Sequence, residues 1–244
     1  MFLKLSTIAL IPALIVQGYL VKKNTPRLPE PKGERCGVIG QGHTLSILIL
    51  GDSAAAGVGV QFQEQALLGS ILSELKHQFK ISYQLQAKTG DTTIQVIQNI
   101  QSISHEHFDV VITSVGVNDV TKLTDPKRWI KQQHLFYAEI EQCFSPKLVL
   151  ATGVPPMNLF PALPNPLSWL FGQYSQQMNN ALAKFIQKKA MYQLIQFDLA
   201  KFNSLNLDMA EDGFHPSQEI YQLWGQEVAE KIRQNFLDKI LMNE

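Results

Sequence analysis

Short apolar runs alternate along the chain with longer segments whose apolar residues recur at helical spacing. The short runs contain few charges, as strands buried on both faces of a sheet require, and they lie at residues 44–50, 81–86, 109–115, 147–151 and 192–197. The longer segments predict helices over residues 63–79, 92–104, 126–143, 172–190 and 217–236. The pattern therefore predicts five successive strand–helix units.

Strands that alternate with helices imply right-handed crossovers and a parallel sheet covered on both faces. An eight-stranded barrel would need eight such units and about 250 residues. Five units instead fit an α/β fold, a three-layer αβα sandwich with a five-stranded parallel sheet and flavodoxin-like winding in the order 2-1-3-4-5. Sheets of this type bind ligands at the carboxyl ends of their strands, so we expect the chemistry at that edge.

Composition narrows the classes of partner. The 21 Lys and Arg residues balance the 21 Asp and Glu residues, and there is no basic stripe with interleaved aromatic residues, so nucleic acid is not expected as a partner. The two cysteines, Cys36 and Cys143, could pair in an oxidising compartment, but two isolated cysteines far apart in the sequence are more often unpaired. No His, Cys, Asp or Glu spacing suits a metal, so no metal site is predicted.

Four short segments carry residue types that can perform chemistry. They are Gly51-Asp52-Ser53, Gly90, Gly116-Val117-Asn118-Asp119 and Asp212-Gly213-Phe214-His215-Pro216. The first three follow the first three predicted strands, and the fourth precedes the last predicted helix. Because the carboxyl ends of parallel strands meet at one edge, we expect these segments to lie close together.

Ser53 and His215 suit the roles of nucleophile and general base. Small residues follow Ser53, which lets a substrate carbonyl approach the backbone at the start of a helix. Asp212, three positions before His215, can accept a hydrogen bond from Nδ1 and leave Nε2 free to take the serine proton. The plainer alternatives are a helix N-cap for Ser53 and a simple turn for Asp212-Gly213.

Three donors are candidates for an oxyanion hole. The backbone N–H groups of Ser53 and Gly90 and the side-chain NH2 of Asn118 can converge on a tetrahedral oxyanion. Glycine at position 90 keeps a side chain out of the acyl site. Plain turns at Gly90 and at residues 116–119 are the alternatives.

At these residues the chain resembles the SGNH hydrolases, also called the GDSL esterase/lipase family. Gly51-Asp52-Ser53 matches the nucleophile block, Gly90 the glycine block, residues 116–119 the G-x-N-D block and residues 212–216 the D-x-x-H-P block. The match spans residues 45–232. It departs from the family at Ala54, where leucine is usual, and at Ala87, near Gly90, where a polar residue is often found.

The resemblance implies hydrolysis of carboxylic esters through an acyl-enzyme on Ser53, with His215 as base, Asp212 as orienter and no cofactor. The expected substrate is a small-molecule ester or an ester of a lipid or acylated sugar. Two alternatives stay open: an SGNH-type O-acyltransferase, in which an alcohol replaces water, and a non-catalytic binding module on the same fold. Intact Ser53, Asn118, Asp212 and His215 argue against the second.

The amino end differs from the rest of the chain. Residues 5–21 are predominantly apolar and nearly long enough to cross a bilayer. We therefore expect residues 1–23 to be a signal peptide or N-terminal membrane anchor, residues 24–43 a linker and residues 44–244 the hydrolase domain. An anchor is favoured over a cleaved signal, because Val16-Gln17-Gly18 is only a weak cleavage site.

The sequence is compatible with two locations of the domain. An apolar segment before a hydrolase domain is most simply a secretion signal, which favours a membrane-anchored or exported protein. Lys22, Lys23 and Arg27 outnumber the positive charge before the segment, however, and the positive-inside rule would then leave the domain facing the cytoplasm.

The segment 155–171, after the fourth predicted strand, is rich in proline and apolar residues. Its place at the carboxyl edge predicts that Met157, Phe160 and Trp169 bind the acyl group, as a wall or as a lid that faces the bilayer. The alternative is that the segment only covers the core.

Overall fold

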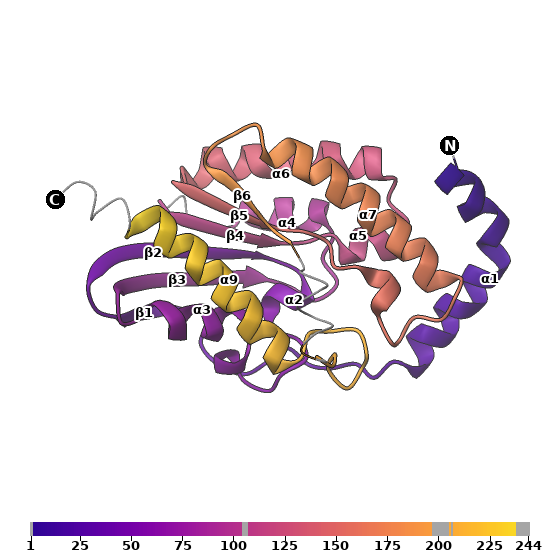
Figure 1. The fold of residues 1–244 in the computed structure, drawn as a ribbon, viewed down its shortest axis with the longest axis horizontal. Helices are drawn as coiled ribbons and strands as arrows, with labels where there is room; N and C mark the ends of the chain where they lie inside the picture. The colour runs from indigo at the N-terminus through magenta and orange to yellow at the C-terminus, as the bar shows by residue number, and fades with distance from the viewer. Residues whose placement is uncertain (1, 104–106, 197–204, 206, 238–244) are drawn as a thin grey trace.

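A single six-stranded sheet forms the centre of the protein, with helices packed on both faces (Figure 1). The structure is a computed structural model that describes residues 2–103, 107–196, 205 and 207–237. The strands are β1 (Cys36–Gly40), β2 (His43–Gly51), β3 (Phe79–Ala87), β4 (Val110–Ser114), β5 (Leu148–Thr152) and β6 (Tyr192–Ile195).

Five of these strands are parallel and follow the predicted order. Across the sheet they lie as β3-β2-β4-β5-β6, which is 2-1-3-4-5 when the strands are counted from β2. β4 and β5 are buried at every position, as their uninterrupted apolar character predicts. The αβα sandwich with flavodoxin-like winding is therefore confirmed. Residue 197 of the last predicted strand lies outside the described residues.

The predicted count of five strands was wrong, because β1 adds an antiparallel strand at the edge beside β3. Its residues fall within the segment expected to be a linker. All five are exposed, and two of them are glycine, so the sequence shows neither an apolar run nor an alternation. Backbone hydrogen bonding to β3 is what forms this strand, and hydrophobic patterning does not reveal it.

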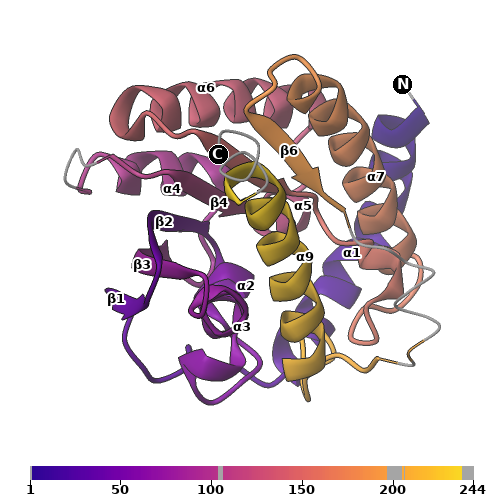
Figure 2. The same cartoon turned by 60° about the vertical axis from the view of Figure 1, so that its left-hand side comes forward.

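The helices form two layers, which Figure 2 separates clearly. One apolar core lies between the sheet and the helices α3 (Leu67–Leu75) and α9 (Gln218–Phe236). A second core lies between the opposite face and the helices α4 (Thr93–Ile100), α6 (Pro126–Phe144) and α7 (Leu167–Ile186). Both faces of the sheet are thus covered, as a parallel sheet requires.

Two predicted helices have different limits in the structure. The predicted helix 63–79 is divided into a 3₁₀ turn, η1 (Gln63–Gln65), and α3. It also ends before residue 79, which already begins β3. Helix α7 begins at Leu167, inside the segment predicted to be a loop. Pro166 precedes its first residue, where a missing N–H is harmless.

The apolar amino-terminal segment forms helix α1 (Phe2–Asn24), which packs against α7. Leu3 and Leu14 are buried on the inner face of α1, whereas Ile8, Ile15 and Tyr19 are exposed on the outer face. Residues Leu5–Asn24 are long and apolar enough to cross a membrane. This character is compatible with a signal or an anchor.

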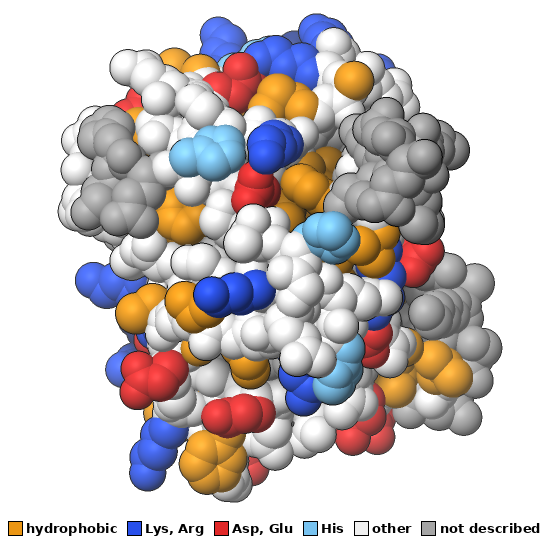
Figure 3. Space-filling model, turned by 90° about the vertical axis from the view of Figure 1, so that its left-hand side faces the viewer, with side chains coloured by type: hydrophobic (Ala, Val, Ile, Leu, Met, Phe, Trp, Pro, Cys, Tyr) orange, Lys and Arg blue, Asp and Glu red, His pale blue; other side chains and the backbone are white. Residues whose placement is uncertain are grey.

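The carboxyl ends of the parallel strands lead into the segments that carry the predicted chemistry. The short helices α2 (Ser53–Ala56) and α5 (Val117–Thr121) and the 3₁₀ turn η2 (Met157–Leu159) follow β2, β4 and β5 (Figure 1). The face at the opposite end of the strands shows Lys and Arg side chains interspersed with Asp and Glu (Figure 3). Cys36 and Cys143 are free thiols.

Candidate active site

Three side chains form a hydrogen-bonded chain at the carboxyl edge of the sheet. The hydroxyl oxygen of Ser53 lies 3.0 Å from Nε2 of His215. On the other side of the ring, Nδ1 of His215 lies 2.5 Å from Oδ2 of Asp212. The structure thus brings together the residues predicted as nucleophile, base and orienter.

Ser53 is held between a buried strand and a short helix. β2 ends at Gly51, and Asp52 caps α2 by accepting a hydrogen bond from the backbone N–H of Ala54 at 3.2 Å. Ser53 is the first residue of α2, and only 8% of its surface is exposed. Its hydroxyl therefore has a defined position facing His215.

The loop before α9 fixes the imidazole of His215. Oδ1 of Asp212 accepts hydrogen bonds from the backbone N–H groups of Phe214 and His215, each at 2.9 Å. Burial raises the pKa of Asp212, but the hydrogen bonds from the His215 ring and from the two N–H groups outweigh burial and hold the pKa below its ordinary value. An ionised Asp212 can hold the tautomer that leaves Nε2 of His215 unprotonated and can stabilise an imidazolium.

A glycine that was not singled out in the sequence keeps the two halves of this site in contact. Gly59 has φ 115°, and a Cβ there would lie 2.2 Å from the carbonyl oxygen of Pro216. The hydroxyl of Tyr221, in α9, donates to the carbonyl of Val58 at 2.7 Å. The loop after α2 is thereby tied to the loop that carries His215. The closely spaced glycines 57 and 59 were the signal in the sequence.

The two other predicted oxyanion donors follow β3 and β4. Nδ2 of Asn118, in α5, donates to the backbone carbonyl of Asp91 at 3.0 Å, which fixes the side chain and leaves its second N–H for a ligand. Gly116 has φ 140°, and a Cβ there would lie 2.6 Å from Val154, so glycine is needed for the turn into α5. Gly90 has φ 89°, and no described atom lies within 4 Å of a Cβ built on it.

A buried network holds α4, α5 and α6 together behind Asn118. Oδ2 of Asp119 accepts hydrogen bonds from the backbone N–H and the hydroxyl of Thr93, at 3.0 and 2.9 Å. The Thr93 hydroxyl accepts from Nε1 of Trp129 and from Nε2 of Gln133. Burial raises the pKa of Asp119 despite the two bonds from Thr93. The network gives Asp119 a structural role beside the site.

Asp52 is a further buried carboxylate beside the site. Burial raises its pKa to about 7; the Ala54 hydrogen bond opposes this rise, whereas the charges of Asp119 and Asp91 add to it. Oδ2 of Asp52 has no hydrogen-bond partner among the described residues. Asp52 stands beside Ser53 in the chain, yet its burial and its acidic neighbours depend on the tertiary fold, so the sequence did not indicate a perturbed group here.

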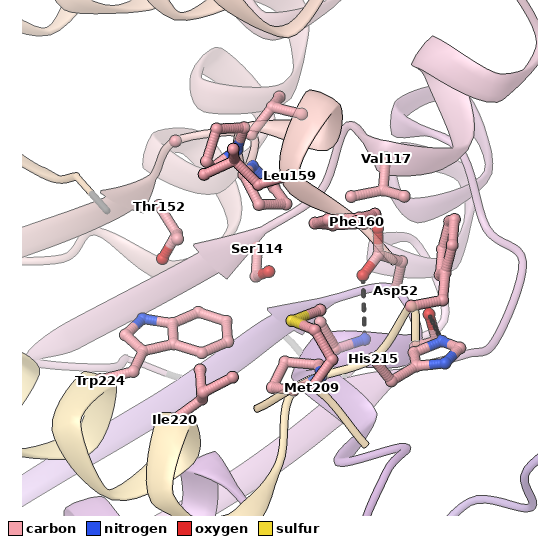
Figure 4. Close-up of a pocket in the computed structure, with 18 of the residues that line it drawn as sticks. Asp52, Ser114, Val117, Thr152, Leu159, Phe160, Met209, His215, Ile220 and Trp224 are labelled. Atoms are coloured by element: carbon pink, nitrogen blue, oxygen red, sulfur yellow. Dashed lines mark hydrogen bonds between the residues drawn. The ribbon is translucent and has the colours of Figure 1, made fainter. Parts of the chain in front are cut away.

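A cavity of about 280 Å³ opens beside Ser53 and His215 (Figure 4). Most of its lining is apolar, and it is closed by the ends of β4 and β5, the segment after β5, and the first turns of α9. Its walls include Val117, Leu159, Phe160, Met209, Ile220 and Trp224. Such a shape and lining suit an apolar ligand whose reacting group lies at Ser53.

The three residues predicted to bind the acyl group lie in three different environments. Phe160 lines the cavity, next to Leu159. Met157 is fully buried in the core and does not line the cavity. Trp169 lines a separate cavity of about 440 Å³ beside α7. The sequence missed Ile220 and Trp224, because their place in the cavity depends on how α9 packs.

Comparison with known proteins identifies the family. The model of the GDSL-like lipase/acylhydrolase family matches residues 49–223. The chain belongs to this family, which confirms the resemblance carried by the four short segments. Membership supports ester hydrolysis as the general chemistry of the protein. No curated protein sequence matches the chain significantly.

Solved structures with the same fold cover most of the chain. The psychrotrophic esterase EstA from Pseudoalteromonas sp. is 17% identical, with a TM-score of 0.58 over 78% of this chain and 97% of that one. A lipolytic protein of the G-D-S-L family from Veillonella parvula is 15% identical, with a TM-score of 0.58 over 76% and 96%. The acetyl xylan esterase AlAXEase is 16% identical, with a TM-score of 0.59 over 77% and 100%. At these identities the likeness concerns the fold.

Proposed function

We propose that the protein is a serine esterase that cleaves carboxylic esters through an acyl-enzyme on Ser53. The observation that carries this proposal is the hydrogen-bonded chain from Asp212 through His215 to Ser53 at the mouth of an apolar cavity. A nucleophile within reach of a base, which is itself oriented by a third group, is the arrangement that activates a serine hydroxyl.

The reaction follows from the atoms in contact. Nε2 of His215 takes the proton as Oγ of Ser53 attacks the ester carbonyl, and a tetrahedral oxyanion forms. The same Nε2–H then protonates the departing alcohol, which leaves the acyl group bonded to Ser53. Water, activated by His215 in the same way, attacks the acyl-enzyme and releases the carboxylic acid.

The oxyanion is assigned to the backbone N–H groups of Ser53 and Gly90 and to the side-chain amide of Asn118. Two features support this assignment. The bond from Asn118 to the Asp91 carbonyl holds the amide in place before substrate binds, and the open space around Gly90 admits a ligand. Donors that are already oriented stabilise developing charge without reorganisation.

A fluorophosphonate probe tests the nucleophile directly. The wild-type protein should gain one covalent label on Ser53, and Ser53→Ala should lose both the label and hydrolysis of p-nitrophenyl esters. Ser175→Ala is a matched control, because the Ser175 hydroxyl is buried in α7 and donates to the Phe171 carbonyl. Label on Ser53→Ala, or unchanged turnover, would refute the mechanism, and a wild-type protein that takes no label would be a binding module.

Product analysis separates hydrolysis from acyl transfer. Both reactions share the acyl-enzyme, and they differ in whether water or an alcohol attacks it. With an added alcohol such as glycerol, a hydrolase should release mainly the free acid. A predominant glycerol ester would instead assign the protein as an O-acyltransferase.

We also propose that α1 is retained and associates the domain with a membrane. Gln17 supports retention, because its side chain donates to the Asn165 carbonyl at 2.6 Å and accepts from the Leu167 N–H at 3.1 Å. The outer face of α1 is apolar, and Lys22 and Lys23 at its end suit anionic lipid headgroups. A helix that is apolar on all sides needs a second cover besides the domain.

Intact-mass measurement and vesicle flotation test this placement. Protein isolated from cell membranes should retain residues 1–18, and it should float with vesicles that contain anionic lipid. Replacing the exposed Ile8 and Ile15 with Gln should weaken flotation more than Thr7→Val, since Thr7 faces Tyr174 of α7. A mature protein that begins after Gly18 would refute retention.

A further inference from the structure

Two hydroxyl side chains stand where the strand pattern would place aliphatic ones. On β4 and β5, residues alternate between the two faces of the sheet. The residues that face α3 and α9 are Val110, Ile112, Leu148 and Leu150, all of which belong to the core on that side. The next positions in these two columns are Ser114 and Thr152, which are paired across the strands.

The hydroxyl of Thr152 is buried and unpaired. Thr152 is only 5% exposed, and its Oγ1 has no hydrogen-bond partner among the described residues. Thr113 differs from Thr152 in this respect, because its hydroxyl lies 3.0 Å from the hydroxyl of Tyr137. Thr113 comes one residue before Ser114 and therefore lies on the opposite face of the sheet. Buried hydroxyls are normally paired, because leaving one without a partner is unfavourable.

Thr152 and Ser114 line the same cavity as the catalytic residues. Figure 4 shows His215 on one side of this cavity and Thr152 with Trp224 on the other, with Ser114 between them. The cavity of about 280 Å³ has room for a medium-length acyl chain. Gly51, two residues before Ser53, pairs with Ser114, and Ser114 pairs with Thr152, so Thr152 lies two strand spacings, about 10 Å, from the strand that leads to Ser53. An extended acyl chain of about eight carbons on Ser53 spans a similar length and would bring its far end to these hydroxyls.

We propose that this cavity binds the acyl chain and that Thr152, with Ser114, selects an acyl group that carries an uncharged hydroxyl near its far end. The substrate class is thus an ester of a medium-chain hydroxy acid. A carboxylate at that end is disfavoured, because the described residues of the lining include no Lys or Arg, whereas Asp52 and Asp208 belong to it. This inference rests on the proposed function, since it takes Ser53 as the point of acyl attachment.

The experiment compares two esters that share the same leaving group. kcat/KM is measured for p-nitrophenyl octanoate and p-nitrophenyl 7-hydroxyoctanoate with the wild-type protein and with Thr152→Val, Thr152→Ser and Thr113→Val. The wild type should prefer the hydroxy ester. Thr152→Val has nearly the same shape without the hydroxyl, and it should reduce that preference roughly five- to tenfold. Thr152→Ser, which retains the hydroxyl, should retain the preference, and so should Thr113→Val.

Each outcome bears on a different proposal. If the wild type hydrolyses both esters equally, or if Thr152→Val keeps the full preference, the role of Thr152 is overturned while the esterase proposal stands. If neither ester is hydrolysed and Ser53 takes no fluorophosphonate label, both proposals fail together. Should Thr152→Val not fold, Thr152→Ala, which also lacks the hydroxyl, takes its place, and a full preference in that variant would overturn the role of Thr152.

Discussion

Replacing the buried carboxylate of Asp52 with an amide should change how the stability of the protein depends on pH. Asp52 is 1% exposed, and burial raises its pKa to about 7 from an ordinary value of 3.8. Between these two values the native state keeps a proton on Asp52 that the unfolded chain has lost. Folding in this range therefore takes up a proton, and that uptake becomes less favourable as the pH rises.

The sign and size of the effect follow from this difference in pKa. The contribution of Asp52 to the free energy of unfolding is greatest below the unfolded pKa and is lost as the pH rises through the native pKa. A difference of about three pKa units corresponds to about 4 kcal/mol, of which roughly 2.5 kcal/mol is lost between pH 5 and pH 8. Asparagine has the same shape and can accept the Ala54 hydrogen bond, but it does not titrate. Asp52→Asn should therefore gain about that much stability relative to the wild type over this range.

Urea unfolding, followed by tryptophan fluorescence at several pH values, measures this difference. Glu30→Gln is the matched control. Burial raises the pKa of Glu30, but the hydrogen bonds from Thr89 and the interactions with Arg35 outweigh it and hold the pKa below its ordinary value. Its contribution is therefore complete above the unfolded pKa, and the difference between Glu30→Gln and the wild type should stay nearly constant from pH 5.5 to pH 8. Parallel curves for Asp52→Asn and the wild type would refute the reasoning.

Three further predictions concern turnover. Asn118→Ala should lower kcat roughly 10²–10³-fold with a smaller change in KM, because the lost donor acts on charge that develops in the transition state; a loss confined to KM would assign Asn118 to substrate binding. Asp212→Asn should lower kcat roughly 10⁴-fold by favouring the wrong tautomer of His215, and activity near that of the wild type would mean that another group orients the ring. Phe160→Ala should lower kcat/KM for octanoate more than for acetate, by about 1–3 kcal/mol. Equal losses on the two esters would make Phe160 a structural residue, and the same pair of assays on Trp169→Ala tests the second cavity.

The sequence predicts the parallel sheet well because burial on two faces leaves a strong apolar signal. β4 and β5 are apolar runs with almost no polar interruption, and their order follows from the right-handed crossovers. β1 leaves no such signal, since an exposed edge strand of glycine and mixed residues is held by its backbone alone. The start of α7 was misplaced because the prolines before Leu167 suggested a loop, although proline is compatible with a helix start.

In the candidate site, too, some residues could be predicted from the sequence and others could not. Ser53, Asp212 and His215 could be predicted because each belongs to a local segment with a recognisable spacing, and the fold then brings the segments together. The walls of the cavity could not be predicted, because Trp224 reaches the ends of β4 and β5 only through the packing of α9 on the sheet. Met157 and Phe160 lie three residues apart and look alike in the sequence, yet one faces the core and the other the cavity.

The position of α9 near the end of the chain affects when, during synthesis, the candidate site can be completed. Ser53 and its proposed base are 162 residues apart, and α9, which follows His215, packs on α3, where Arg233 pairs with Glu74 at 2.9 Å. A growing chain therefore acquires Ser53 and the proposed oxyanion donors first and the proposed base last. If Ser53 is the nucleophile, the nascent protein should stay inactive toward esters until α9 has left the ribosome and packed on α3, because before then Ser53 has no group to take its proton.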